Sequence, residues 1–130
     1  MYRAETNGIS VTVEPRFMED RSDPAEQRFF WAYTVEIANS GPAPVQILAR
    51  HWIITDQNGR REDVRGLGVV GEQPLIEPGE SFTYTSGCPL PTPSGTMVGS
   101  YEAIGGDGKV FSVAIPAFSL DIPGAKRVLN

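Results

Sequence analysis

Short runs in which apolar and polar residues alternate recur along this chain, and clusters of glycine and proline separate them. The chain holds 14 glycines and 11 prolines among 130 residues, which leaves little room for long helices. Alternation with a period of two is typical of β-strands that bury one face. The sequence therefore predicts an all-β fold, and its length predicts a single domain over residues 1–130.

The clearest strand is expected around residues 29–37, where every second residue is large and apolar. One face of this strand carries Phe29, Trp31, Tyr33, Val35 and Ile37. Other strands are expected over residues 9–17, 45–56, 60–64, 81–86, 96–104 and 109–115, with a last short edge strand at 118–120. Because proline cannot donate to a β-ladder, Pro15 predicts that the strand over 9–17 is frayed or at an edge by its end.

The run over residues 45–56 carries apolar side chains on both of its faces. Regular alternation places them in two sets, Leu48, Trp52 and Ile54 on one face and Val45, Ile47, Ala49, His51 and Ile53 on the other. This pattern predicts a central strand whose outer side is partly covered.

Turn residues connect the expected strands. Asn58-Gly59 predicts a type I′ hairpin turn, because these residues tolerate left-handed dihedral angles. Pro78-Gly79 occupies the central positions of a type II turn. Residues 66–78 are expected to form a long irregular connection, and the three prolines within 87–95 predict an extended loop that holds Cys88.

Seven to eight strands at intervals of roughly ten residues favour an antiparallel, immunoglobulin-like β-sandwich. A closed barrel is the competing architecture. The spacing of Ile76, Pro78, Gly79 and Phe82 is similar to the Leu-x-Pro-Gly-x-x-Tyr corner of fibronectin type III domains, with phenylalanine in place of the tyrosine.

The charge balance and the cysteine content exclude several classes of partner and compartment. Lys and Arg number 11 against 16 Asp and Glu, a net charge of −5, so neither nucleic acid nor an anionic membrane is expected to bind. The single Cys88 cannot form an intramolecular disulfide, and the sequence shows neither a membrane-spanning run nor a signal segment. We expect a soluble cytoplasmic protein.

Residues 66–71 read Gly-Leu-Gly-Val-Val-Gly, a literal G-x-G-x-x-G. In dinucleotide-binding folds this motif leads directly into a helix whose amino end binds the pyrophosphate. Here Pro74 and Pro78 follow within eight residues, and such a helix cannot continue through them. Two interpretations stay open: an anion-binding nest without a helix, or a loop that needs glycine dihedral angles for its own geometry.

No set of residues in the sequence forms a convincing catalytic or metal-binding group. His51 stands in the middle of an expected strand, where we expect a packed or surface side chain. Cys88 has no cationic neighbour in sequence that would activate its thiol, so a Cys88-dependent activity is only a residual alternative. The acidic residues Glu19, Asp20, Asp23 and Glu26 lack an ordered ligand spacing and predict a solvated loop. We expect no enzyme, no metal site and no cofactor.

The remaining candidates are surface features. Val69, Val70, Leu75 and Ile76 lie in the glycine-rich connection, where they could either contact a partner or close the end of the sandwich. The alternation also leaves Tyr2, Phe30 and Trp52 without a firm place in the core. The candidate binding loop consists of Gly66, Gly68, Val69, Val70, Gly71, Glu72 and Gln73. A sandwich also has edge strands, through which a peptide or a second copy could pair.

Several segments of the chain resemble the ApaG family. The central ones are residues 68–74, Gly-Val-Val-Gly-Glu-Gln-Pro, and residues 78–90, Pro-Gly-Glu-Ser-Phe-Thr-Tyr-Thr-Ser-Gly-Cys-Pro-Leu. Residues 29–35, 50–54, 94–101 and 115–120 are similar to the family as well, so the resemblance covers nearly the whole chain.

This resemblance implies a fibronectin type III-like sandwich and a link to divalent-cation homeostasis, namely cobalt tolerance and magnesium efflux. Similar domains in eukaryotic F-box proteins and in a polymerase-delta-interacting protein imply partner binding. We therefore expect a non-enzymatic protein-interaction or regulatory module. The alternative is a small-ligand binder that takes phosphate-rich nucleotides or divalent cations through residues 66–71.

Overall fold

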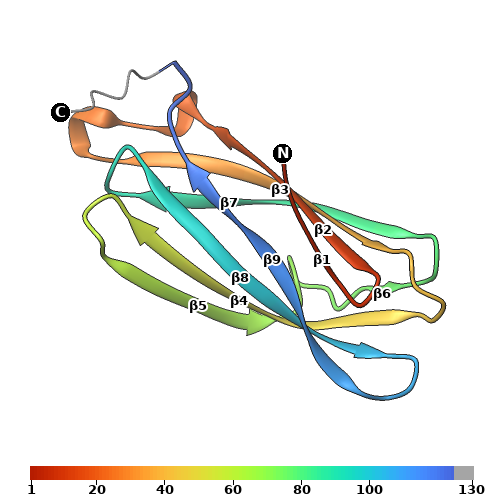
Figure 1. Ribbon diagram of the computed structural model, residues 1–130. Helices are drawn as coiled ribbons and strands as arrows, with labels where there is room; N and C mark the ends of the chain where they lie inside the picture. The colour runs from red at the N-terminus through yellow and green to blue at the C-terminus, as the bar shows by residue number, and fades with distance from the viewer. Residues whose placement is uncertain (125–130) are drawn as a thin grey trace.

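Two antiparallel sheets pack face to face in the computed structural model, which describes residues 1–124 (Figure 1). The first sheet has the order β1 (Tyr2–Thr6), β2 (Ile9–Phe17), β3 (Phe29–Asn39), β7 (Ser81–Leu90). The second has the order β5 (Arg61–Leu67), β4 (Val45–Asp56), β8 (Gly95–Gly105), β9 (Val110–Leu120), and β6 (Leu75–Ile76) also pairs with β4. The predicted β-sandwich is confirmed, with nine strands among the described residues.

Within residues 1–124, helical structure is confined to two single turns of 3₁₀ helix, η1 (Glu19–Arg21) and η2 (Pro24–Glu26). Both lie in the acidic connection between β2 and β3, and none of their residues is buried. Among the described residues, no helix has the length and apolarity needed to cross a bilayer.

Aromatic side chains from both sheets meet in the core. Trp52 of β4 contacts Tyr33 of β3 edge to face, with ring centroids 5.3 Å apart, and it contacts Phe118 of β9 at 5.9 Å. Trp31 is 1% exposed, and its indole N–H donates to the Asp121 carbonyl at 2.9 Å. The alternation over residues 29–37 therefore predicted the core face of β3 correctly, whereas Trp52 is a core residue that the alternation did not assign firmly.

The first strand, β1, was not predicted from the sequence. It pairs with β2 from Tyr2↔Val13 to Thr6↔Ile9, so β2 is internal over most of its length. Pro15 lies beyond the last pair with β1, where β2 has a neighbour on one side only. The expectation that this strand is frayed or at an edge by its end is thus confirmed.

A β-bulge in β4 changes the faces that were predicted for this strand. The pairing of β4 with β8 shifts register between Ile47 and Ala49, so that Leu48 is inserted into the ladder. As a result Val45 and Ile47 share the buried face with Trp52, although strict alternation separates them.

Further turns and strand ends differ from the sequence prediction. Asn58 does not adopt a positive φ and Gly59 does (φ 84°), so the β4–β5 turn is not type I′. Strand β7 continues through Pro89 to Leu90, which places Cys88 in a strand with its side chain buried. Residues 118–120 belong to the continuous strand β9. The turn at Glu77–Glu80 agrees with the prediction, since Gly79 has φ 83° and the Glu80 amide donates to the Glu77 carbonyl at 3.0 Å.

Asn39 at the end of β3 holds the β3–β4 turn and β6 together. Its side-chain amide donates to the carbonyls of Ala43 at 2.8 Å and Ile76 at 2.9 Å, and its Oδ1 accepts from the Gly41 amide at 2.9 Å. Asn39 is 2% exposed, so water cannot replace these partners without opening the turn.

We expect Asn39→Ala to lower the free energy of unfolding by about 3 kcal/mol, because it leaves buried backbone groups unsatisfied. Urea unfolding followed by tryptophan fluorescence measures this loss. Ser40→Ala is the matched control, since Ser40 Oγ makes an exposed bond to the Gly8 carbonyl; a similar loss in both variants would contradict the role of Asn39.

Candidate functional site

The glycine-rich connection folds back on itself instead of opening into a helix. The amide of Val69 donates to the Glu72 carbonyl at 2.7 Å, and the Glu72 amide donates to the Val69 carbonyl at 2.9 Å. Val70 and Gly71 form the tip between them, with φ angles of 44° and 81°. No helix follows, as expected from the prolines after the motif. The predicted irregular connection over 66–78 is wrong at both ends, because β5 continues to Leu67 and the short strand β6 pairs with β4.

The bulged residue of β4 anchors this connection. The Leu48 carbonyl accepts from the Gly68 amide at 2.7 Å and from the Gln73 side-chain amide at 2.9 Å. From the other side, Gln46 Nε2 donates to the Gln73 carbonyl at 3.1 Å. The loop is therefore held at both of its ends by β4.

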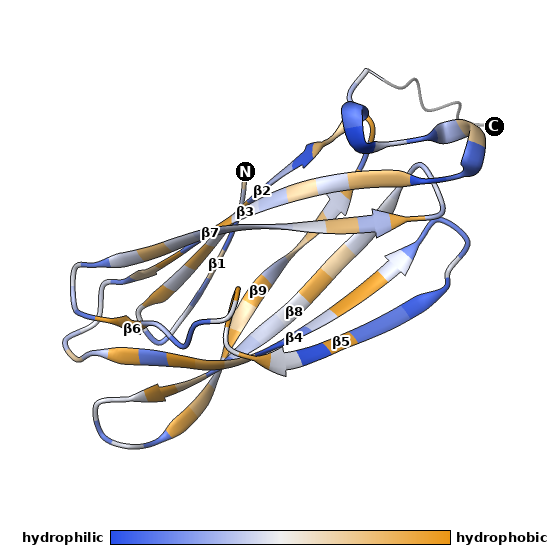
Figure 2. Cartoon of the chain, turned by 180° about the vertical axis from the view of Figure 1, so that it is seen from behind, coloured by the Kyte–Doolittle hydropathy of each residue, from blue (hydrophilic) through white to orange (hydrophobic). Residues whose placement is uncertain are grey.

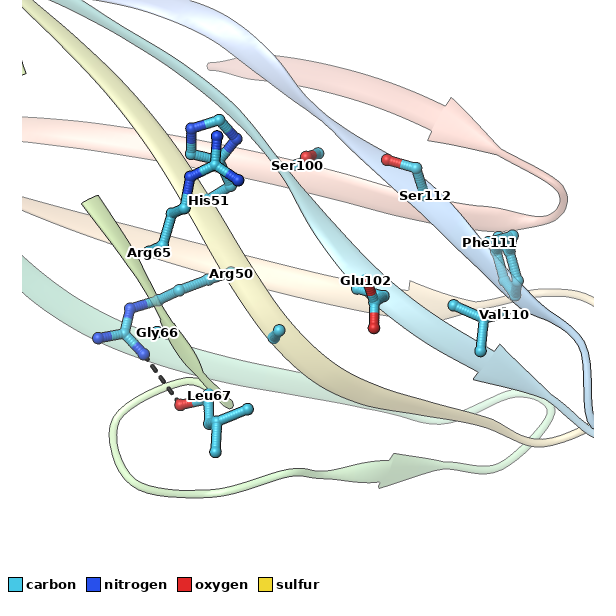
Figure 3. Close-up of a pocket in the computed structure, with 11 residues that line it drawn as sticks. Arg50, His51, Arg65, Gly66, Leu67, Ser100, Glu102, Val110, Phe111 and Ser112 are labelled. Atoms are coloured by element: carbon cyan, nitrogen blue, oxygen red, sulfur yellow. Dashed lines mark hydrogen bonds between the residues drawn. The ribbon is translucent and has the colours of Figure 1, made fainter. Parts of the chain in front are cut away.

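The side chain of Arg50 holds the start of the loop by hydrogen bonds. Its Nη1 donates to the carbonyls of Leu67 and Gly68, each at 3.0 Å, and Figure 3 shows the bond to Leu67. A Cβ at Gly66 would lie 2.8 Å from the Arg50 guanidinium, so a side chain at this position would require the guanidinium to shift. The guanidinium is thus engaged with the backbone of the loop.

The predicted loop residues divide into anchors and exposed residues. Val69 is fully buried in the core, and Ile76 of β6 is buried as well, so these two apolar residues close the sandwich. Val70 is 53% exposed and Leu75 is 59% exposed. Leu67, which the sequence analysis did not single out, is 79% exposed. We define Leu67, Val70 and Leu75 as the loop patch.

Next to the loop patch, the outer face of the second sheet is hollowed. The hollow has a volume of about 680 Å³ and is lined by residues of β4, β5, β8 and β9 (Figure 3). Its floor carries the small side chains Ala49, Ser100 and Ser112, and Leu67 and Val110 stand at its margin. Register across four strands creates this hollow, since Leu67 pairs with Ala49, Ala49 with Glu102 and Glu102 with Ser112.

A small polar network adjoins the hollow at His51, which is one of its lining residues. His51 Nε2 lies 3.0 Å from Asp63 Oδ2, and Arg61 Nε donates to Asp63 Oδ1 at 2.8 Å. The hydrogen bonds from Arg61 and then His51 hold the pKa of the Asp63 carboxyl well below its usual range. Arg65 stands beside His51 on the same face (Figure 3). The sequence left open whether His51 is packed or at the surface; its side chain is partly exposed on the outer face, and its partner Asp63 was not predicted.

Cys88 is buried in strand β7 and does not lie in an accessible loop. It is 2% exposed, and burial, followed by the charge of Glu62, raises the pKa of its thiol to about 12. Burial also raises the pKa values of Tyr33, Tyr84 and Tyr101, and the hydroxyls of the last two are hydrogen-bonded to each other. A thiol in this setting is protonated at neutral pH and is a poor nucleophile.

Residues 1–124 contain no group of three or more His, Cys, Asp or Glu side chains placed to hold a metal ion. The acidic residues Glu19, Asp20, Asp23 and Glu26 lie in and beside the two 3₁₀ turns, on an exposed connection.

Replacing Gly71 or Gly68 by alanine should lower the free energy of unfolding by different amounts. Gly71→Ala should destabilise by roughly 1 kcal/mol, because only the positive φ opposes a side chain there. Gly68→Ala should cost at least twice as much, because its Cβ would lie 2.2 Å from the Glu72 carbonyl oxygen. Urea unfolding of the two variants compares the costs, and equal costs would mean that the loop opens without strain.

The raised pKa of the Cys88 thiol predicts how the free energy of unfolding changes at alkaline pH. The thiol has a pKa of 9.0 when unperturbed and about 12 in the fold, so above pH 9 the unfolded chain loses this proton first. The free energy of unfolding should therefore fall by up to about 1.4 kcal/mol per pH unit from this group, beginning near pH 9. Cys88→Ala should show a shallower decline than the wild type between pH 9 and 10.5, and identical slopes would contradict the burial of the thiol.

Comparison with known proteins places the chain in a family. A sequence profile described as the ApaG domain matches residues 19–105. Protein ApaG of Methylobacterium sp. (strain 4-46) is 61% identical over all 130 residues of both chains, and Protein ApaG of Maricaulis maris is 60% identical over the same span. A crystal structure from Bordetella pertussis, described as an ApaA protein, superposes with a TM-score of 0.88 at 54% identity and covers 90% of this chain and 95% of its own. The chain therefore belongs to the ApaG family.

Proposed function

We propose that this protein is a non-enzymatic interaction module that binds a partner protein through the loop patch and the adjoining hollow. The observation that carries this proposal is the conformation of Val70. A β-branched residue with φ 44° is strained, and glycine or asparagine would occupy this position at a lower cost. Val70 is also exposed, so its side chain does not repay the strain by packing in the core.

The loop patch has the properties of a preformed binding surface. Leu67 and Leu75 flank β4 on the outer face of the second sheet, opposite Ala49 and Gln46 respectively. Hydrogen bonds from Arg50 and to Leu48 hold the backbone between them. A partner that binds a rigid apolar surface loses less conformational entropy than one that must order a loop.

The adjoining hollow offers complementary groups. A partner side chain between Leu67 and Val110 would rest on the small residues of the floor, with Arg65 and Glu102 available for polar contacts at the rim. Any contribution to cobalt or magnesium homeostasis, as implied by the family resemblance, would then be exerted through the bound partner.

Binding of a phosphate-rich nucleotide or a divalent cation by residues 66–71 has less support. An anion nest requires free amides that converge on the ligand. The amides of Gly68, Val69 and Glu72 are occupied by bonds within the protein. The Glu72 side chain would also place a carboxylate beside the phosphates.

Affinity capture of the partner from the native host tests the proposal, with variants chosen to distinguish loss of binding from loss of stability. Leu67→Glu and Leu75→Glu should each lower recovery of the partner by about tenfold, the cost of removing an apolar anchor. Val70→Gly should also lower recovery, yet it should raise the free energy of unfolding by roughly 1 kcal/mol because it relieves the strained φ. Loss of binding in a stabilised variant cannot come from misfolding.

Val98→Lys is the matched control for these variants. Val98 is a 38% exposed valine on β8, pairs with Ile53 and lies outside the hollow. It should recover the partner as well as the wild type does. Equal recovery by wild type, Leu67→Glu, Leu75→Glu and Val70→Gly would overturn the assignment of the loop patch.

A further inference from the structure

We propose that β7 pairs with the β7 strand of a second copy of this chain, so that the two first sheets join into one continuous sheet. This surface is separate from the loop patch and does not depend on the function proposed above. The strand lies at the edge of the first sheet, beside β3 (Figure 1). In the described part of the chain, residues 81–90 make no backbone hydrogen bond outside the β3 ladder.

Strand alternation identifies the backbone groups that face the open edge. The Asn39 amide donates to the Glu80 carbonyl, whereas the Phe30 carbonyl accepts from the Met18 amide on the β2 side. The backbone N–H and C=O groups of the odd-numbered residues of β3 therefore point toward β7. These residues pair there with even-numbered residues of β7, such as Tyr84. The free edge consequently presents the N–H and C=O groups of the odd-numbered residues Ser81, Thr83, Thr85 and Gly87, and the C=O of Pro89.

The side chains along this edge leave room for another strand. All ten residues of β7 are uncharged, and the four that present an amide at the free edge are small. Gly87 is packed under the Phe30 ring, where a Cβ would lie 2.3 Å from its Cζ. Pro89 has no N–H, so the part of the edge that can both donate and accept ends at Gly87.

The other edges of the two sheets carry features that oppose pairing. Strand β5 has four charged residues among its seven and is coloured largely as hydrophilic (Figure 2). Strand β1 is short and carries Arg3 and Glu5. Strand β9 contains Pro116 and a register shift, and its Ala114 amide already donates to Thr6 Oγ1 at 3.1 Å. Charges, proline and bulges are the usual means by which proteins block an edge.

An antiparallel pair centred on Tyr84 is self-complementary. A two-fold axis there places Thr83 opposite the second copy's Thr85, and Ser81 opposite its Gly87. Each of the four residues donates one bond and accepts one, so four residues per copy give eight backbone hydrogen bonds across the axis. Threonine opposite threonine is a favourable cross-strand pair, and no like charges meet.

Charge elsewhere on the molecule sets the conditions under which the dimer forms. Each copy carries a net charge of −5, so two copies repel at low ionic strength. An interface made mostly of one strand pair is small, which places it among weak, concentration-dependent contacts. Association should therefore increase with both protein concentration and salt.

Sedimentation equilibrium over roughly 10 µM to 1 mM protein, at low and at 0.5 M salt, measures this association. We expect a monomer–dimer equilibrium that shifts toward dimer as salt rises. Amide hydrogen exchange by NMR then locates the interface, since the amides of Ser81, Thr83, Thr85 and Gly87 should become protected with concentration. Protection of a different strand, such as β5 or β9, would overturn the proposal.

Two variants complete the test. Thr83→Lys places like charges near each other across the axis and should weaken dimerisation at least about tenfold. Thr12→Lys is its matched control, because Thr12 lies on the same face two strands further in, is paired with both β1 and β3, and has no free backbone edge. A monomer at 1 mM in high salt, or equal dimerisation by both variants, would refute the pairing; circular dichroism verifies that both are folded.

Discussion

The β-bulge at Leu48 determines how β4 serves both the core and the candidate site. The extra residue lets Val45, Ile47 and Trp52 face the core along one strand. It also exposes the Leu48 carbonyl toward the glycine-rich connection, where it accepts two hydrogen bonds. Without the bulge, the second half of β4 would turn its faces over, and neither Trp52 nor Arg50 would keep its present contacts.

The two sheets have different surroundings on their exposed sides. The second sheet combines small outward side chains with apolar margins at Leu67 and Val110, an arrangement that suits side-chain recognition. The first sheet ends in an uncharged strand whose backbone groups are unpaired at one edge, an arrangement that suits backbone recognition. The chain thus offers two chemically distinct surfaces on a single core.

The sequence predicted the sandwich because regular alternation is a local property. Residues 29–37 follow it without interruption, and β3 matches the prediction face for face. Alternation failed at β4, because a bulge changes the phase without changing composition. It also missed β1, whose five residues include Arg3 and Glu5 and which gains its stability from pairing with β2.

The sequence predicted which segment forms the candidate site, but not which of its side chains are buried or exposed. The glycines marked residues 66–73 as unusual, but no local pattern distinguishes buried Val69 from exposed Val70. That difference depends on the tight reversal between Val69 and Glu72. The hollow depends on the register of four strands, so Ala49, Ser100 and Ser112 become neighbours only in the folded sheet.

The position of the first strand has a consequence for the order in which the protein can fold during its synthesis. Tyr2 in β1 is hydrogen-bonded to Ser119 in β9, and the amide of Ala114 is bonded to Thr6. These contacts join residues that are separated by more than a hundred positions along the chain. Among the described strands β9 is synthesised last, so the nascent chain cannot close the core of the sandwich before β9 has left the ribosome. Until then, the apolar faces of β2 and β3 stay uncovered on the side that β9 will occupy.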